Sequence, residues 1–298
     1  MPVYASFSEA LPRESFVMLS GLAKRLKLPA RITAKIDFWG ATGHMYDRVA
    51  AEMLDMAIES GALQKGDTVI ETAHGAFAPS LCIAAVRRGI RVILCVPEAL
   101  PTGRQKLLTA LGAKLQYVPP TEGRVGMLRR ATALEQEGAG FFLNYLDNDN
   151  NPEVHRLTTG PSIRNTLGDT VDYFVCGVNS GGTLTGTGEY LKGWSNLKII
   201  AVEPYENQIL TGGFAGKHGI TDMGLPFVPP NYNHYIVDGV MTTSTGDAST
   251  MADTVFFTDG IPTAIAGGAA LAAAVGLARR PENEGKHIVT VFPAKRGF

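Results

Sequence analysis

The chain has 298 residues, with 27 basic and 28 acidic side chains and a net charge of −1. That length suffices for one large domain or two medium ones with a sizeable core. The balanced charge, without a lysine- or arginine-rich cluster among aromatic residues, argues against a nucleic-acid partner. The N-terminus lacks the pattern of a secretory signal, and no apolar run approaches the roughly 18 to 20 residues of a membrane span.

The cysteines, Cys82, Cys95 and Cys176, are three in number and lie far apart in the sequence. The first two fall within the apolar runs LCIAAV and VILCV, which suits reduced thiols in a core. Neither a disulfide framework nor a Cys-x-x-Cys metal site is present. These features predict a cytoplasmic protein with reduced cysteines and no metal site.

The first half of the chain alternates helix-like and strand-like segments. Glycines at 40 and 43 precede a predicted helix over residues 45–60, whose apolar positions follow helical spacing. The segments DTVIE, RVILCVP and KLQYV then read as strands, and PSLCIAAVRRG, GRQKLLTALG and GRVGMLRRATALEQE read as helices. Proline-rich PPTEG, residues 119–123, reads as a loop.

A second alternating series follows. The strands are VDYFVCGV, LKIIAVEP and IVTVFP, and the helices are GTLTGTGEYLKG and the small-residue stretch after IPTA. Residues 226–235 form a loop by their proline content. Nearly continuous apolar strands between helices indicate parallel sheets covered on both faces. The two series predict an α/β fold of two doubly wound, three-layer lobes, with a ligand crevice between them.

Several segments resemble the cysteine synthases and their relatives in the tryptophan-synthase-β superfamily, the fold type II enzymes of pyridoxal phosphate (PLP). They are residues 61–98, NNPEVHRLTTGPSI at 150–163, GVNSGGTLTGTGEYLK at 177–192, IIAVEP at 199–204, LTGG at 210–213 and MGLPFVP at 223–229. The resemblance runs from about residue 16 to 293. It implies a smaller lobe over residues 40–145, a larger lobe from 1–39 and 146–298, and a homodimer.

The family's Schiff-base lysine lies in a Ser-Val-Lys-Asp-Arg motif, which this chain matches at residues 44–48 with His-Met-Tyr-Asp-Arg. Tyr46 therefore stands at the lysine position, and a phenol cannot condense with an aldehyde to give an imine. The resemblance thus implies that no covalent PLP is formed.

Two further PLP contacts of the family are changed. The Thr-Ser-Gly-Asn-Thr-Gly loop is matched at residues 73–78, where Gly75 remains, Ala76 replaces the asparagine that meets the ring hydroxyl, and Phe77 follows. In the Ser-Ser-Gly-Ala segment, Gly267 replaces the serine that meets the ring nitrogen. Tyr145 stands near the position of a family glutamine. Without the lysine and these ring contacts, ordinary PLP chemistry on an amino acid is not expected.

The phosphate loop is retained in kind. Glycines let backbone N–H groups approach an anion, and the helix that follows directs its positive end toward it. Two hydroxyl side chains add donors. We therefore expect a phosphate, a sulfate or a small anionic metabolite to bind at the loop residues Asn179, Ser180, Gly181, Gly182 and Thr183.

Two function classes remain open from the sequence. One is a reprogrammed, PLP-independent enzyme of lyase or transferase type, with Tyr46 and His74 as acid and base and His44 nearby. The other is a pseudoenzyme that serves as a binding or regulatory partner, with Phe77 and Tyr145 filling the old site. The aromatic, histidine-bearing replacement favours the enzyme, and non-covalent PLP binding is a third alternative. His155 is interpreted as structural.

Overall fold

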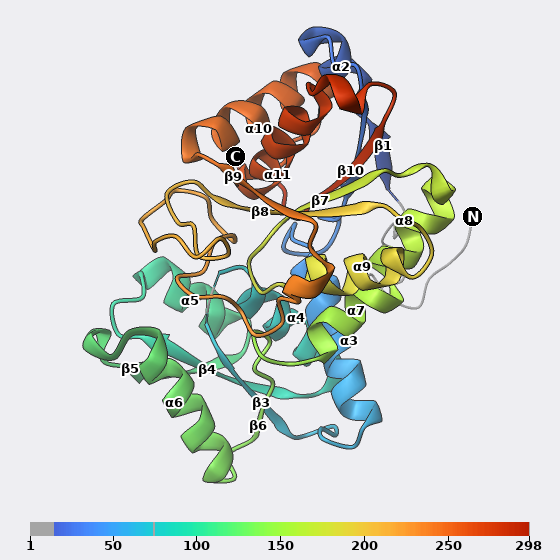
Figure 1. The fold of residues 1–298 in the computed structure, drawn as a ribbon. Coiled ribbons are helices and arrows are strands. Elements are labelled where there is room, and N and C mark those ends of the chain that lie inside the picture. The colour runs from blue at the N-terminus through green and yellow to red at the C-terminus, as the bar shows by residue number, and fades with distance from the viewer. Residues whose placement is uncertain (1–14, 74, 298) are drawn as a thin grey trace. The chain divides into compact units, whose positions relative to one another are not determined.

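The computed structural model describes residues 15–73 and 75–297. The chain divides into two compact units (Figure 1). The larger unit combines Met1–Trp39, described from residue 15, with Asn151–Phe298, and the smaller unit is Gly40–Asn150.

A six-stranded sheet forms the centre of the larger unit. Its order is β1 (Phe16–Met18), β2 (Arg31–Ile36), β10 (His287–Phe292), β7 (Tyr173–Gly177), β8 (Lys198–Pro204) and β9 (Gly239–Thr243). β1 pairs antiparallel with β2, and the other pairs are parallel. Every residue of β10 is buried, as expected for a central parallel strand covered on both faces.

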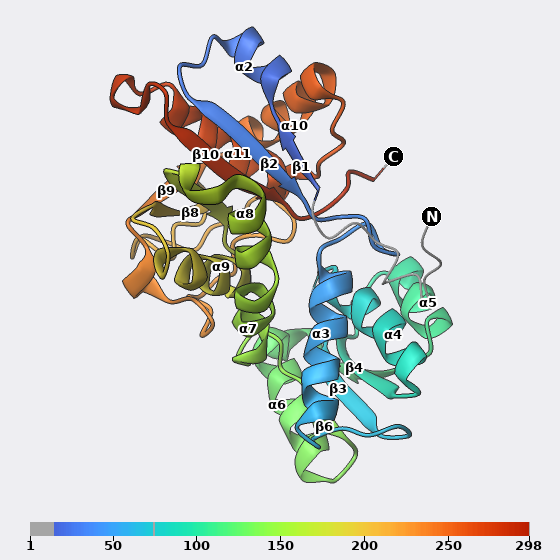
Figure 2. The same cartoon turned by 90° about the vertical axis from the view of Figure 1, so that its right-hand side faces the viewer.

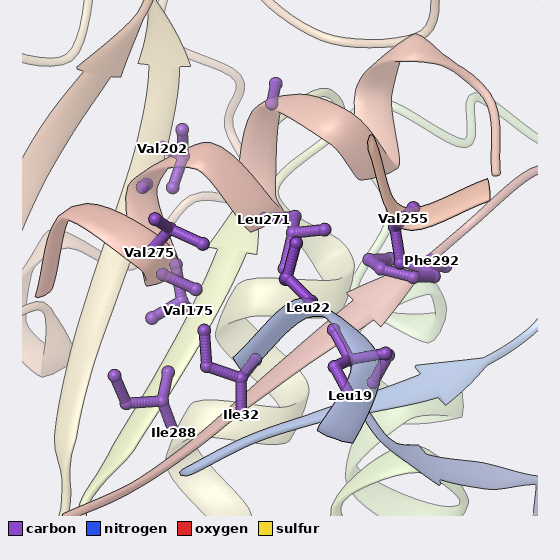
Figure 3. Close-up of a cluster of buried hydrophobic side chains, with 14 of the residues drawn as sticks. Leu19, Leu22, Ile32, Val175, Val202, Val255, Leu271, Val275, Ile288 and Phe292 are labelled. Atoms are coloured by element: carbon purple, nitrogen blue, oxygen red, sulfur yellow. The ribbon is translucent and has the colours of Figure 1, made fainter. Parts of the chain in front are cut away.

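Helices cover both faces of this sheet. The larger unit contains α2 (Ser20–Leu26), most of α7 (Asn150–Leu157), α8 (Thr159–Leu167), α9 (Gly182–Lys192), α10 (Thr245–Asp259) and α11 (Ile265–Ala278). Side chains of α2, α10 and α11 form one apolar core with the strands, part of which is drawn in Figure 3. Those of α8 and α9 contribute to a second core that contains Phe174 and Val289.

The small residues of α11 permit its close packing against α10. A Cβ atom added at Gly268 would lie 2.1 Å from the carbonyl oxygen of Ala248 and 2.9 Å from the Cβ of Ala252. Gly268 is therefore required by the approach of the two helix backbones.

The smaller unit has a four-stranded, fully parallel sheet. Its order is β5 (Ala113–Val118), β4 (Arg91–Pro97), β3 (Thr68–Thr72) and β6 (Phe141–Phe142). The helices are α3 (Tyr46–Glu59), α4 (Phe77–Arg88), α5 (Thr102–Ala110) and α6 (Gly123–Gln136). α3 and α4 lie side by side (Figure 2), and α6 packs its apolar side chains onto β3 and β4.

The strands and helices expected from hydrophobic periodicity are present. The short strands β1 and β6 and the partly exposed β9 were not expected, because they carry too few buried residues for a clear pattern. The proline-rich stretch 119–123 is not entirely loop, since Pro120–Glu122 forms a 3₁₀ turn.

The three cysteines are buried and free, as expected, and burial raises the pKa of each thiol to about 12. No helix among the described residues is long and apolar enough to cross a membrane.

Candidate functional site

Four of the predicted site residues pack together within the smaller unit, and we call His44, Tyr46, Phe77 and Tyr145 the aromatic cluster. Tyr46 and Phe77 are the first residues of α3 and α4. The Tyr46 ring stacks on His44 with centroids 4.3 Å apart. It meets Phe77 and Tyr145 edge-on at 5.5 and 6.0 Å. Phe77 and Tyr145 stack on each other at 4.1 Å.

The aromatic cluster is buried. Phe77 and Tyr145 are 0% and 1% exposed, and His44 and Tyr46 are 5% and 6% exposed. The backbone N–H of Tyr46 donates to His44 Nδ1 at 3.2 Å, so the Nδ1 atom carries no proton. The start of α3 thus holds the imidazole against the phenol ring.

Glu71, the penultimate residue of β3, anchors Tyr145. One carboxylate oxygen accepts from the Tyr145 backbone N–H at 2.9 Å. The other accepts from the Thr72 backbone N–H at 2.7 Å and the Thr72 hydroxyl at 3.1 Å. Burial raises the pKa of Glu71 to about 7, although these hydrogen bonds and the charge of Arg124 oppose the shift. The sequence interpretation did not single out this residue, although a glutamate in an otherwise buried strand signalled it.

The turn between β3 and α4 carries Gly75 and Ala76. Gly75 has a positive φ of 46°, and its carbonyl oxygen accepts from Arg104. Ala76 caps α4 and presents only a methyl group. The predicted acid–base residue His74 lies outside the described residues.

The predicted anion loop, residues 179–183, lies in the larger unit at the start of α9. Gly181 has a left-handed φ of 87° and directly precedes the helix. The Ser180 side chain is only 5% exposed. Its oxygen accepts from the Asn151 side-chain amide at 3.1 Å and from the Gly182 backbone N–H at 3.4 Å.

The second hydroxyl of the loop, Thr183, contacts His155 on α7. The two atoms, Thr183 Oγ1 and His155 Nε2, are 3.2 Å apart, and His155 Nδ1 lies 2.9 Å from the Thr159 hydroxyl. His155 is 1% exposed. His155 is therefore buried, in line with the structural role expected from the sequence, and it also contacts the loop through Thr183.

Gly267, on α11, faces a filled space. A Cβ atom added there would lie 2.0 Å from Thr263 Oγ1 and 3.2 Å from the Phe292 ring. Thr263 is itself fully buried. A serine at position 267 would thus require Thr263 to move. Nothing in the sequence pattern indicated Thr263.

The structure brings His44, Tyr46, Phe77 and Tyr145 together in the smaller unit, whereas the anion loop and Gly267 belong to the larger unit. Among the described residues, no group of three or more His, Cys, Asp or Glu side chains could hold a metal ion.

Comparisons with known proteins identify the family. A family model described as pyridoxal-phosphate dependent enzyme matches residues 10–294. The cysteine synthase of Staphylococcus aureus (strain Mu50 / ATCC 700699) is 34% identical over 89% of this chain and 86% of its own length.

Solved structures agree. Cysteine synthase from Entamoeba histolytica has a TM-score of 0.91 at 32% identity, covering 99% of this chain and 88% of the other. O-ureido-L-serine synthase has a TM-score of 0.91 at 28% identity, covering 99% and 92%. The expected α/β fold with two sheets is confirmed, and the chain belongs to the pyridoxal-phosphate dependent enzyme family, as a cysteine-synthase-like member.

Proposed function

We propose that this family member forms no PLP Schiff base and acts as a binding protein for a small oxyanion-bearing ligand. The observation that carries the proposal is the packing of Tyr46 within the buried aromatic cluster. Its phenol ring fills the place that the motif match gives to the lysine. The sequence alone favoured an enzyme over a binding protein. We propose the opposite order, because the side chains at the family's catalytic positions pack as a core.

The residues that the resemblance assigns to the pyridine ring of PLP and to its aldehyde do not fit this cofactor. An imine requires an amine, and the motif position offers a phenol. Ala76 supplies no hydrogen bond to a ring hydroxyl. The space beside Gly267 is occupied by Thr263 Oγ1, 2.0 Å from where a side chain would begin. The last two differences also argue against non-covalent PLP binding, since each removes a hydrogen-bond partner of the pyridine ring.

The loop 179–183 offers donors to an anion. The hydroxyls of Ser180 and Thr183 and the positive end of α9, which begins at Gly182, favour a tetrahedral anion such as phosphate or sulfate. A small metabolite with such a group is the proposed ligand. A homodimer is proposed from the family resemblance, and a cytoplasmic location from the free, buried cysteines.

A second candidate is a PLP-independent lyase or transferase. The stacking of His44 on Tyr46 at 4.3 Å favours it, because two groups able to transfer protons are then in contact. In this candidate Tyr46 and His74 act as acid and base on a small anionic substrate. Tyr46→Phe would lower its rate by about a hundredfold or more, whereas in the binding protein the same change leaves ligand affinity unaltered.

The central test is chemical. The purified protein is incubated with PLP, treated with borohydride and analysed by intact mass, with the Staphylococcus aureus cysteine synthase as a positive control. We expect the control to retain the reduced cofactor and this chain to retain none. An internal-imine absorption band that borohydride removes, with label left on the chain, would contradict the proposal.

The variant Tyr46→Lys tests whether lysine alone is missing. We expect no cysteine-synthase activity, because Ala76 and Gly267 still leave the ring without partners. Robust activity in this single variant would mean that the lost ring contacts matter less than proposed here.

A further inference from the structure

We propose that Asn151 and His155 on α7 set the two loop hydroxyls, Ser180 and Thr183, as hydrogen-bond donors to the bound oxyanion. The inference rests on the proposed anion site and assigns positioning roles within it. Neither α7 residue needs to touch the ligand.

The two positioning residues occupy one face of α7. They are four residues apart, so their side chains project from the same side of the helix. Each is 1% exposed, and each contacts a different hydroxyl of the loop. Gly182 permits this arrangement, because a Cβ atom there would lie 2.0 Å from Asn151 Oδ1.

The hydrogen bonds of Ser180 give its hydroxyl a direction. A hydroxyl has one proton to donate and two lone pairs to accept with. The Ser180 oxygen accepts from the Asn151 amide at 3.1 Å and from the Gly182 N–H at 3.4 Å, which uses both lone pairs. Within residues 15–73 and 75–297, no group accepts the Ser180 proton. A buried hydroxyl in this state favours a ligand that offers an acceptor, as an oxyanion does.

The Thr183 hydroxyl is set through the histidine. When the Thr159 hydroxyl donates to His155 Nδ1 across 2.9 Å, the ring proton lies on Nε2. Nε2–H then donates to Thr183 Oγ1 across 3.2 Å. The Thr183 proton therefore points away from the histidine, as donation to the oxyanion requires. The opposite tautomer would draw that proton to the histidine and turn the Thr183 lone pairs toward the anion. The Nε2–H tautomer is the one that suits an oxyanion.

The test measures sulfate binding by calorimetry, because the charge of sulfate does not change near neutral pH. Both His155→Leu and Asn151→Ala should weaken binding about tenfold, the scale of one hydrogen bond to a charged group. His155→Gln, which retains an N–H at the reach of Nε2, should bind nearly as well as wild type. Thr187→Val serves as the matched control, since it removes a buried hydroxyl one turn along α9 and should leave affinity unchanged.

Double-mutant cycles separate positioning from general damage. In a Thr183→Val background, His155→Leu should cause no further loss, and in a Ser180→Ala background Asn151→Ala should cause none. Additive losses in both cycles, or failure of His155→Gln to retain binding, would overturn the positioning roles. If wild type binds sulfate and the α7 variants bind it equally well, only this inference fails. If wild type binds neither sulfate nor inorganic phosphate, the proposed anion site fails with it.

Discussion

The aromatic cluster and the predicted anion loop match the motifs of the resemblance to very different degrees. In the aromatic cluster, positions that the motifs assign to lysine and to polar loop residues hold Tyr46 and Phe77, which pack against Tyr145. In the loop, Ser180 and Thr183 keep their hydroxyls, and both hydroxyls are held by residues of α7. One region packs as core, while the other presents the hydroxyls on which the proposed anion site depends.

The contrast reflects the different packing that a catalytic lysine and an anion-binding loop require. A catalytic lysine must remain reachable, so its surroundings cannot be packed to the density of a core. Where no amine has to be reached, as we propose at Tyr46, large rings can occupy that volume and stabilise the smaller unit. The loop has no room for larger side chains at its glycines, because a Cβ at Gly182 would meet Asn151 and one at Gly181 would meet Tyr232.

The largest expected effect follows from truncating the aromatic cluster. Phe77→Ala should lower the free energy of unfolding by about 3–5 kcal/mol, the usual range for a fully buried phenylalanine. Thr183→Val should change the unfolding free energy by about 1 kcal/mol at most while weakening anion binding. Urea titration of both variants measures the difference.

The matched control for this comparison is Phe257→Ala, because Phe257 is 80% exposed. We expect that variant to lie within about 0.5 kcal/mol of wild type. Should Phe77→Ala be equally mild, the aromatic cluster would not be a core and the contrast between the two regions would collapse.

The next effect is a pH dependence carried by Glu71. Its pKa of about 7 in the folded chain exceeds the ordinary 4.5, so the folded state binds the proton more tightly than the unfolded state. The free energy of unfolding should therefore fall as pH rises from about 4.5 to about 7, by up to roughly 3 kcal/mol. In Glu71→Gln this component of the slope should vanish, and urea titrations across the same pH range measure it. If the variant keeps the same slope, the pH dependence arises from groups other than Glu71.

A smaller effect is expected from placing at position 267 the serine that the motif match assigns there. Gly267→Ser should destabilise the larger unit by about 1–3 kcal/mol, as overpacking does, since its Cβ would lie 2.0 Å from Thr263 Oγ1. Adding Thr263→Ala removes that oxygen and should recover most of the loss. Thermal unfolding of the single and double variants is the measurement. A single variant as stable as wild type would mean that the space is open to a side chain.

The sequence was sufficient for much of the fold and for part of the site. Strands such as β4 and β10 are continuous apolar runs, and the residues of the aromatic cluster and the loop were found by their place in motifs. The partners that hold these residues were not found. Thr263 occupies the space beside Gly267. Asn151 contacts the Ser180 hydroxyl, 29 positions away in the sequence. Such relations depend on tertiary packing, which no local pattern encodes.

The smallest expected effect is a pH dependence of the stability of the larger unit, opposite in sign to the one that Glu71 gives the smaller unit. Burial lowers the pKa of His287, and the charge of Arg31 acts in the same direction. The ring lies between the hydroxyls of Thr33 at 2.8 Å and Thr170 at 3.1 Å, which suit its neutral form. Because the unfolded chain binds this proton more readily, the stabilisation is complete above about pH 6.5 and is lost as pH falls below it. Hydrogen exchange of β10 amides, corrected for intrinsic rates, should therefore accelerate on acidification, while that of β3 beside Glu71 should slow. His287→Gln should abolish the change in β10 alone, and parallel responses of the two strands would show that the units do not titrate independently.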